Sequence, residues 1–472
     1  MLMTFSGLFT RMLPIGRACA AIAMLSLSAD TMAQVDFNQY FEDETLRLDY
    51  VFGGDAAKQY IFLDQMYRQD KWAGRRGRLD ETFLEGNGQL TVRDHDTHKI
   101  IYVWTFSTLF QEWLRENEAK EGNRSFETCY NIPFPKQKVD VTVTLTDNYR
   151  RVVTEATHTI DPQDVLIRQN GQRHLPYKYV WKGAGMNSRP DDEVNLADCV
   201  DIAIIADGYT ADEMEKFYKD SQRAADALFE REPFSSMKQR FNVVAVAAPS
   251  ADSGPSVPRK GIWHDTAIGC HYDTFHIDRY LTTEKMQNIY NQLSGVPFEH
   301  IVVLVNSDLY GGGGIYNQVT FTTSDHATFK QVLVHEFGHA YGGLADEYAY
   351  DDMDSEWYPA DVEPWEPNVT TLCDFDSKWK DMMPKDQPIP TPLDPSVPHN
   401  KTVDRNDAKA MARLNACVGV VGVFEGAGYQ TKGCYRPAQE CRMKINEVLD
   451  FCPVCTRAIK RITEFYVSSS EK

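Results

Sequence analysis

Residues 332–348 of the chain read VLVHEFGHAYGGLADEY. His335 and His339 are four residues apart, and such residues share one face of a helix, so both imidazoles can bind one ion. Glu336 lies beside them and can act as general base on a zinc-activated water molecule. The stretch therefore predicts a helix that carries one catalytic Zn2+ ion, bound by the two histidines.

The second half of the stretch departs from the metzincin pattern H-E-x-x-H-x-x-G-x-x-H/D. The position of the third ligand is occupied by Ala345, which cannot bind a metal. Residues 342–343 are a Gly-Gly pair, which can end the helix and lengthen the turn because glycine tolerates positive φ. Asp346 then becomes the favoured third ligand. Glu347 is the first alternative, and Glu356, farther along the chain, is the second.

A glycine-rich stretch, YGGGGIYNQV at residues 310–319, precedes the predicted helix. Glycines let another backbone approach closely, and the following strand could form an exposed edge to which a peptide substrate adds. A flexible hairpin turn is the alternative. Ser324 and Asp325 are candidate caps of the helix. The residues of the predicted substrate edge are Gly311, Gly312, Gly313 and Gly314.

Met443, far downstream in the segment ECRMKINEVLDFCPVC (440–455), is the candidate for a methionine turn below the zinc. In metzincins such a turn supports the site without binding the metal. An ordinary core methionine is the alternative.

Composition narrows the possible partners. The chain has 472 residues, enough for two or three domains, and a net charge of −19, because 68 acidic residues outnumber 49 basic ones. A surface of this sign repels phosphate backbones, which argues against a nucleic-acid partner. No stretch is long and apolar enough to predict a membrane span.

The N-terminus has the pattern of a cleaved signal peptide. Arg11 and Arg17 supply positive charge, and residues 18–29 form a short apolar run. The expected cleavage site, with its small residues, ends at Ala33. We therefore expect export to the periplasm or to the outside of the cell.

The pattern of apolar, polar and turn-forming residues along the chain predicts two folded domains. After a signal peptide at residues 1–33, residues 34–162 alternate apolar and polar positions between turns, which predicts an all-β sandwich. Residues 163–192 are rich in turn formers and are expected to form a linker. In residues 193–472 buried strands alternate with helices, which predicts an α/β, metzincin-like zinc peptidase domain and an α+β chain overall.

Nine cysteines follow the predicted signal peptide, and five of them lie in the last 56 residues. In an exported protein we expect disulfides, with at least one thiol left over because nine is odd. Alternatively, Cys452 and Cys455 are half of a structural zinc knuckle, to which Cys434 or Cys441 could add ligands.

Several of these motifs together resemble the IgA peptidase family of secreted bacterial zinc metallopeptidases. They are DGYT after a buried strand (207–210), YGGGGIY, HEFGHAYGGLADEY and the late C-x-M and C-P-x-C pairs. The resemblance covers roughly residues 192–465, and the preceding sandwich resembles the domain that often comes before this peptidase. It implies that His335 and His339 bind zinc, that Glu336 is catalytic, and that the substrate is immunoglobulin A, another host glycoprotein or dietary protein.

Two functions from different classes follow. The first is a secreted zinc-dependent endopeptidase that hydrolyses peptide bonds of a protein or peptide substrate, with Glu336 as general base. The second is a non-catalytic, adhesin-like glycoprotein-binding protein whose zinc is structural. The presence of His335, Glu336 and His339 together favours the enzyme.

Overall fold

The computed structural model describes residues 34–169, 174–184, 194–350, 357–397, 404 and 406–467. The predicted signal peptide and Glu356 lie outside these residues. None of the described helices combines the length and the apolar character needed to cross a membrane.

Two four-stranded sheets begin the described chain, in the orders β5-β1-β2-β8 and β4-β3-β6-β7. Their pairs are antiparallel, except that the short β8 runs parallel to β2. Apolar side chains of both sheets, such as Leu48 and Tyr50 of the first and Val92 and Val141 of the second, share one buried cluster. The N-terminal region is therefore β-rich, as predicted. Its strands are β1 (Phe41–Gly54), β2 (Gln59–Asp70), β3 (Gly88–Asp94), β4 (Ile100–Phe106), β5 (Arg124–Pro135), β6 (Val139–Thr146), β7 (Val152–Ile160) and β8 (Arg168–Gln169).

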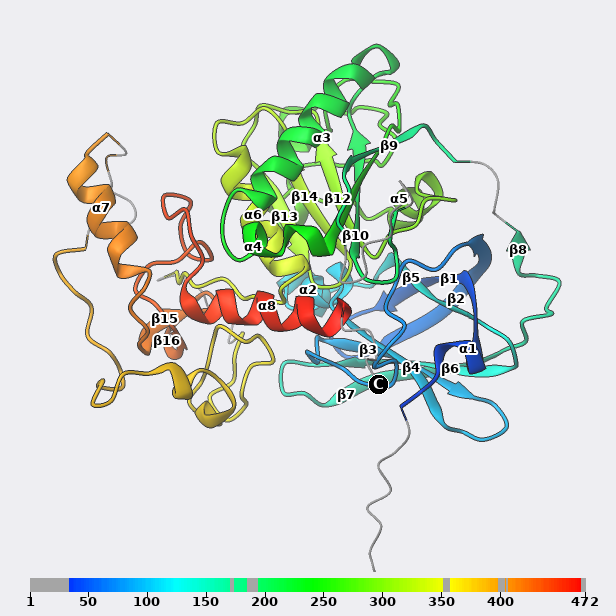
Figure 1. Cartoon of the computed structure of the whole chain (residues 1–472), viewed down its shortest axis with the longest axis horizontal. Helices are drawn as coiled ribbons and strands as arrows, with labels where there is room; N and C mark the ends of the chain where they lie inside the picture. Colours follow the sequence, from blue (N-terminus) through cyan, green and yellow to red (C-terminus); the bar gives the residue numbers. More distant parts are fainter. Residues whose placement is uncertain are drawn as a thin grey trace, which may run out of the picture. The chain divides into compact units, whose positions relative to one another are not determined.

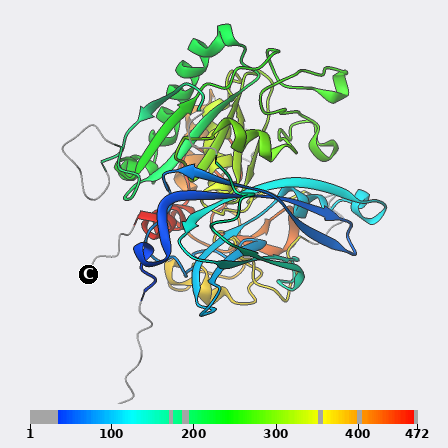
Figure 2. The same ribbon diagram turned by 90° about the vertical axis from the view of Figure 1, so that its right-hand side faces the viewer.

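The outer face of the first sheet is covered by helix α5 (Met286–Gln292). Figures 1 and 2 show the blue strands of this sheet beside the green part of the chain that carries α5. Arg47 of β1 forms a buried ion pair with Asp49, Nε to Oδ1 at 2.6 Å, and its Nη1 donates to Asn291 Oδ1 at 2.9 Å. Because both faces of β1 are covered, it is buried almost throughout instead of alternating.

A six-stranded sheet follows, in the order β13-β14-β12-β10-β11-β9. The four inner strands are parallel, and the edge strands β9 and β13 are antiparallel to their neighbours. This part of the chain is therefore α/β, as predicted. Its strands are β9 (Tyr177–Trp181), β10 (Val200–Asp207), β11 (Phe241–Val246), β12 (His300–Val305), β13 (Gly312–Ile315) and β14 (Val319–Thr323).

Both faces of this sheet are buried. Ala203 and Ile205 of β10 pack in the cluster that contains α5 and the N-terminal sheets. Ile202 and Ile204 point to the opposite face and pack in the cluster that contains α3, α6 and α8. This double burial explains why the strand is apolar at nearly every position.

Helices and a small hairpin complete the fold (Figure 1). The hairpin consists of β15 (Phe424–Ala427) and β16 (Gln430–Arg436). The other helices are α1 (Phe37–Tyr40), α2 (Leu109–Trp113), α3 (Met214–Phe229), α4 (Phe234–Met237), α6 (Phe329–Ala340), α7 (Ala408–Cys417) and α8 (Pro453–Val467).

Two local expectations need correction. The segment expected as a linker contains β9, which pairs with β11 and closes the edge of the six-stranded sheet. Ser324 and Asp325 do not cap α6, which begins at Phe329. Their amides instead donate to the carbonyls of Val305 and Ser307, at 2.9 and 3.0 Å. These bonds tie the chain after β14 to the end of β12.

Candidate metal centre

Helix α6 places His335 and His339 one turn apart beside a cavity, as their spacing predicts. Leu333 and Phe337 anchor the helix in the core on its other side. The two imidazole Nε2 atoms are 3.1 Å apart.

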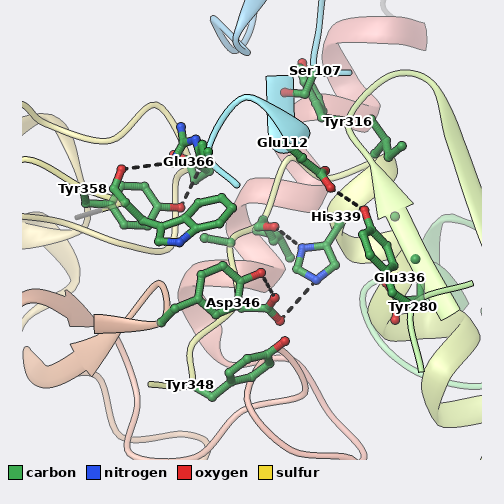
Figure 3. A pocket seen from close by; sticks show the side chains of 18 of the residues that line it. Ser107, Glu112, Tyr280, Tyr316, Glu336, His339, Asp346, Tyr348, Tyr358 and Glu366 are labelled. Carbon is green, nitrogen blue, oxygen red and sulfur yellow. Dashed lines mark hydrogen bonds and ion pairs between the residues drawn. The ribbon is translucent and has the colours of Figure 1, made fainter. Parts of the chain in front are cut away.

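The chain turns back directly after α6. Gly343 has φ of +59°, a left-handed conformation that favours glycine, and the amide of Leu344 donates to the carbonyl of Gly338 at 3.1 Å. The turn brings Asp346 back to the histidines, with its Oδ1 3.1 Å from His335 Nε2 and 3.3 Å from His339 Nε2. Figure 3 shows His339 and Asp346 facing each other in the cavity.

Backbone carbonyls orient both imidazoles. Nδ1 of His335 lies 3.1 Å from the carbonyl oxygen of Arg442, and Nδ1 of His339 lies 2.5 Å from that of Leu344. Because a carbonyl only accepts hydrogen bonds, each Nδ1 carries a proton, and a neutral ring then presents a bare Nε2 to the cavity.

A tyrosine fixes the carboxylate. The hydroxyl of Tyr429 donates to Asp346 Oδ2 at 2.6 Å, while Oδ1 is buried and faces the two imidazole Nε2 atoms. Burial acts to raise the pKa of Asp346, but His339 and His335 outweigh it and hold that pKa well below its usual range. Burial likewise acts to lower the pKa of His339, but the charge of Asp346 raises it to about 9. The carboxylate is therefore ionised.

These donor atoms fit a divalent cation. The two nitrogens and the carboxylate oxygen lie within 4.8 Å of one another, and Tyr429 binds only the other oxygen of the carboxylate. Lone pairs that converge in this way repel each other unless a proton or a cation lies between them. Two imidazoles and one carboxylate, with a fourth position left open, are a donor set that zinc accepts in catalytic sites.

Glu336 lies against the glycine strand β13. A Cβ atom on Gly312 would lie 2.9 Å from Glu336 Oε1, and one on Gly314 would lie 2.3 Å from the Glu336 carbonyl oxygen. The glycines therefore allow the helix backbone to approach the strand closely. Burial raises the pKa of Glu336, although His335 and His339 act to lower it.

The predicted substrate edge is only partly open. β13 is an edge strand, and Gly312, Gly313 and Gly314 line the cavity. However, the amide of Gly312 donates to the carbonyl of Arg279 and its carbonyl accepts from the amide of Leu281, both at 3.3 Å. The segment 279–281 thus already occupies the edge at Gly312.

Met443 lies under the helix, where a methionine turn was predicted. It is fully buried, and a Cβ atom on Gly338 would lie 2.8 Å from its sulfur. Its carbonyl oxygen accepts the amide of Glu347 at 2.9 Å. The Met443 segment therefore supports both α6 and the chain that carries Asp346.

Glu347, the alternative ligand, is not in this group. Its carboxylate lies in a separate cluster with Cys441, Cys452 and Cys455. Disulfides were expected for the five C-terminal cysteines, but all five are free thiols. They are the three cysteines of this cluster together with Cys417 and Cys434.

The cavity has a volume of about 930 Å3, and the N-terminal region forms part of its wall. Glu112 and Arg115 line it together with the metal-ligand candidates, and the hydroxyl of Tyr280 donates to Glu112 (Figure 3). Burial raises the pKa of Glu112 to about 7, although Tyr280 acts to lower it. The N-terminal region thus contributes side chains to the wall of this cavity.

Besides Glu112 and Arg115, sequence reasoning missed Tyr429 and Arg279. Tyr429 binds Asp346 from 83 residues away, and Arg279 lines the cavity and donates to the Tyr350 hydroxyl at 2.8 Å. Neither residue belongs to a local motif, so no signal in the sequence marks it.

Comparison with protein families gives two matches that cover most of the chain. Residues 191–463 match the family described as IgA Peptidase M64, and residues 36–156 match the one described as Peptidase M64 N-terminus. The chain belongs to the IgA peptidase M64 family. This M64 peptidase is therefore a metallopeptidase, and the resemblance seen in its sequence is confirmed.

Other comparisons add little. A solved structure, metalloproteinase-II from Bacteroides fragilis, is similar over 58% of the M64 peptidase chain and 85% of its own, with 10% identity and a TM-score of 0.20. A comparison with curated proteins gives no match.

Proposed function

We propose that this M64 peptidase is a secreted, zinc-dependent endopeptidase. His335, His339 and Asp346 are the proposed zinc ligands, and Glu336 is the proposed general base. The observation that carries the proposal is the convergence of the two imidazole Nε2 atoms and Asp346 Oδ1 beside Glu336, in the wall of one cavity. A third ligand after a Gly-Gly turn, with Met443 below, also supports a metzincin-like peptidase domain.

The metal, Glu336 and two backbone carbonyls each have a separate role in the proposed reaction. Zinc, when bound, supplies a Lewis acid that polarises the peptide carbonyl and acidifies water. The carboxylate of Glu336 accepts the proton of the attacking water and then donates it to the leaving amine nitrogen. The carbonyls of Arg442 and Leu344 hold the imidazoles in the tautomer that leaves Nε2 free.

The rim of the cavity offers stabilisation for the anion that forms on the carbonyl oxygen. Tyr348 points into the cavity (Figure 3), and the Arg279 guanidinium lies near both the Tyr348 hydroxyl and Glu336. Hydrogen-bond donors placed where negative charge develops are a large contribution to catalysis. We assign Tyr348 and Arg279 this role.

The substrate we propose is a host glycoprotein, with immunoglobulin A as the first candidate because the family description names it. The wall built by Glu112 and Arg115 supports a role for the N-terminal region (34–162) in binding substrate beside the peptidase domain (193–472). Incubation with immunoglobulin A should give defined fragments, with immunoglobulin G as the comparison.

Export follows from the N-terminal pattern and is part of the proposal. A culture that secretes the protein should yield a mature chain that begins at Gln34. An N-terminal sequence that begins at Met1 would contradict it.

The decisive variant is Glu336→Gln, which keeps the size and shape of the side chain but cannot accept the proton. We expect full zinc content and an unchanged circular dichroism spectrum, with peptide hydrolysis reduced by at least about 100-fold. Undiminished cleavage would overturn the assignment. Tight glycoprotein binding without cleavage by the unmodified protein, unchanged by chelators, would favour the non-catalytic binding protein instead.

A further inference from the structure

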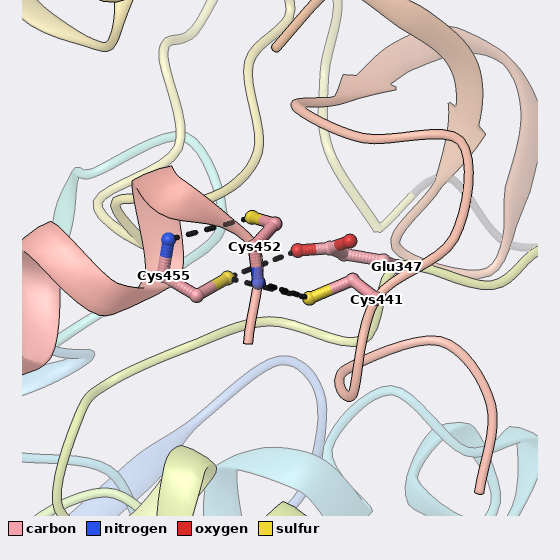
Figure 4. A group of neighbouring side chains, drawn as sticks. All are labelled: Glu347, Cys441, Cys452 and Cys455. Carbon is pink, nitrogen blue, oxygen red and sulfur yellow. Dashed lines mark hydrogen bonds between the residues drawn. The ribbon is translucent and has the colours of Figure 1, made fainter. Parts of the chain in front are cut away.

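A second group of metal-ligating side chains lies below the candidate catalytic centre. It consists of Cys441, Cys452, Cys455 and Glu347, whose ligand atoms all lie within 4.8 Å of one another and which are all fully buried. Figure 4 shows the four side chains directed toward one another. They come from the chain after α6, the segment of Met443 and the start of α8.

The spacing of the sulfur atoms suits a shared ion and not a disulfide. Sγ of Cys441 and Sγ of Cys455 are 3.9 Å apart. A disulfide requires about 2.0 Å. Two thiolates that bind one tetrahedral zinc ion, each at about 2.3 Å, are separated by about 3.8 Å.

Backbone amides support negative charge on the sulfurs. The amide of Cys452 donates to Cys441 Sγ at 3.3 Å, and the amide of Cys455 donates to Cys452 Sγ at 3.5 Å. The C-P-V-C order places Pro453 at the first position of α8, where its missing N–H costs the helix nothing. The first turn of α8 thus presents two sulfurs to the same point.

The carboxylate of Glu347 completes the set. Its Oε1 lies 3.1 Å from Cys455 Sγ and accepts from Asn368 Nδ2 at 2.9 Å, whereas its Oε2 is buried without a hydrogen-bond partner. Such an orphaned buried oxygen is costly unless it is ionised beside a cation or protonated.

Basic residues offset the negative charge of this group. Arg436 is buried and donates to the carbonyls of Glu425 and Gln439. Its positive charge attracts the carboxylate of Glu347. Lys444 also acts on Glu347, although it pairs directly with Glu440 at 2.6 Å.

We propose that Cys441, Cys452, Cys455 and Glu347 bind a second divalent ion, zinc by preference, in a structural site. Three sulfur ligands and one oxygen ligand fill a tetrahedron and leave no position for substrate, which is the signature of a structural zinc site. Binding releases to solvent the protons held by the thiols and by Glu347, and no oxidant is required.

The second ion has a clear mechanical role. Glu347 follows Asp346 directly and its amide donates to the Met443 carbonyl, while Cys441 is two residues before Met443. An ion bound by Glu347 and Cys441 therefore fixes the chain that carries Asp346 against the segment below α6. The site itself does not depend on the proposed catalysis.

The test is the metal content of a chain whose first centre is removed. In the double variant His335→Ala/His339→Ala we expect one zinc ion per chain by inductively coupled plasma mass spectrometry, against two in the unmodified protein. Replacement by Co2+ in the double variant should give a thiolate-to-cobalt charge-transfer band in the near ultraviolet. A double variant without metal, or a disulfide between any two of the three cysteines in the peptide map, would overturn the second site.

The two proposals fail in different ways. One ion in both the unmodified protein and the double variant would refute the first centre and leave the second intact. In the double-variant background, Cys452→Ser should abolish the remaining zinc and the cobalt band. The matched control Cys373→Ser, at an exposed cysteine outside the group, should retain both. Zinc retained in full by Cys452→Ser would also overturn the second site.

Discussion

Asp346 and Glu347 are adjacent carboxylates that join different groups of ligands. Asp346 lies with His335 and His339 in the cavity wall, and Glu347 lies with three cysteines in the core. The sequence places both acids at nearly the same distance from the histidines, so either could have been the third ligand. The turn at Gly343 decides between them, because it sets which side chain returns to α6.

Tyr429 offers a test of how Asp346 is held. Tyr429→Phe removes the 2.6 Å hydrogen bond to Oδ2 and keeps the ring. Loss of such a partner of a metal ligand typically weakens metal binding by about 10–100-fold. We expect that loss of zinc affinity in a competition titration, with hydrolysis recovered at high zinc concentration.

Tyr358→Phe is the matched control. Its hydroxyl donates to Glu366 at 3.0 Å in the same cavity wall and does not contact the ligand group. Equal zinc affinity in Tyr429→Phe and the unmodified protein would show that the tyrosine does not position Asp346.

The predictable part of the site is the part that is contiguous in sequence. His335, Glu336 and His339 follow from helical periodicity, and Asp346 follows from glycine in the turn. Tyr429 reaches Asp346 from 83 residues away, and the carbonyl of Arg442 reaches His335 from 107 residues away. No local pattern encodes such contacts.

Among the elements, the approach of β13 to α6 depends on glycine. A Cβ atom on Gly314 would lie 2.3 Å from the Glu336 carbonyl oxygen and 2.9 Å from His339 Cβ. Gly314→Ala should therefore push the helix away, destabilise the protein by about 1–3 kcal/mol, and weaken zinc binding. Denaturant unfolding and a zinc titration measure the two effects.

Gly419→Ala is the control for backbone entropy. A Cβ atom there meets nothing within 4 Å, so zinc affinity should be unchanged and stability should rise by at most about 1 kcal/mol. The same stability for Gly314→Ala as for Gly419→Ala would show that the close approach is not required.

Glu299, just before β12, should make the free energy of unfolding depend on pH. Burial raises the pKa of Glu299 to about 8, and its Oε1 has no hydrogen-bond partner. Between its unfolded value near 4.5 and about 8, the folded state holds the proton more tightly than the unfolded state. The free energy of unfolding should therefore fall as pH rises through this range, by at most about 1.4 kcal/mol per pH unit from this group.

Glu299→Gln cannot titrate and should remove that contribution. The stability of the variant relative to the unmodified protein should increase from pH 5 to pH 8 in denaturant unfolding. The exposed Glu215→Gln should show no such trend. A constant difference between Glu299→Gln and the unmodified protein would contradict the assignment.

Periodicity predicted most elements but not their edges. The strand β13 was expected as an open edge, and residues 279–281 cover it at Gly312. The expected linker supplies β9 because Tyr177–Trp181 can pair with β11. The disulfides were expected because export was predicted, but cysteine spacing cannot distinguish a disulfide from a set of metal ligands.

At the scale of the whole molecule, the cavity belongs to both halves of the chain. Gln34–Lys472 is one compact unit, and Glu112 and Arg115 face the same cavity as Glu336. The strand pattern of residues 34–162 predicts a β-rich fold but not which surface meets a neighbour. The contact between the two halves arises from tertiary packing, such as the hydrogen bond from Arg47 to Asn291. No single segment encodes it.

The most direct measurement is an anomalous-difference map at the zinc absorption edge, from crystals of the protein grown with zinc. The account predicts a peak at about 2.0–2.2 Å from His335 Nε2, His339 Nε2 and Asp346 Oδ1, with Glu336 beside the open position. No peak at this point, or a peak whose third protein ligand is not Asp346, would contradict it.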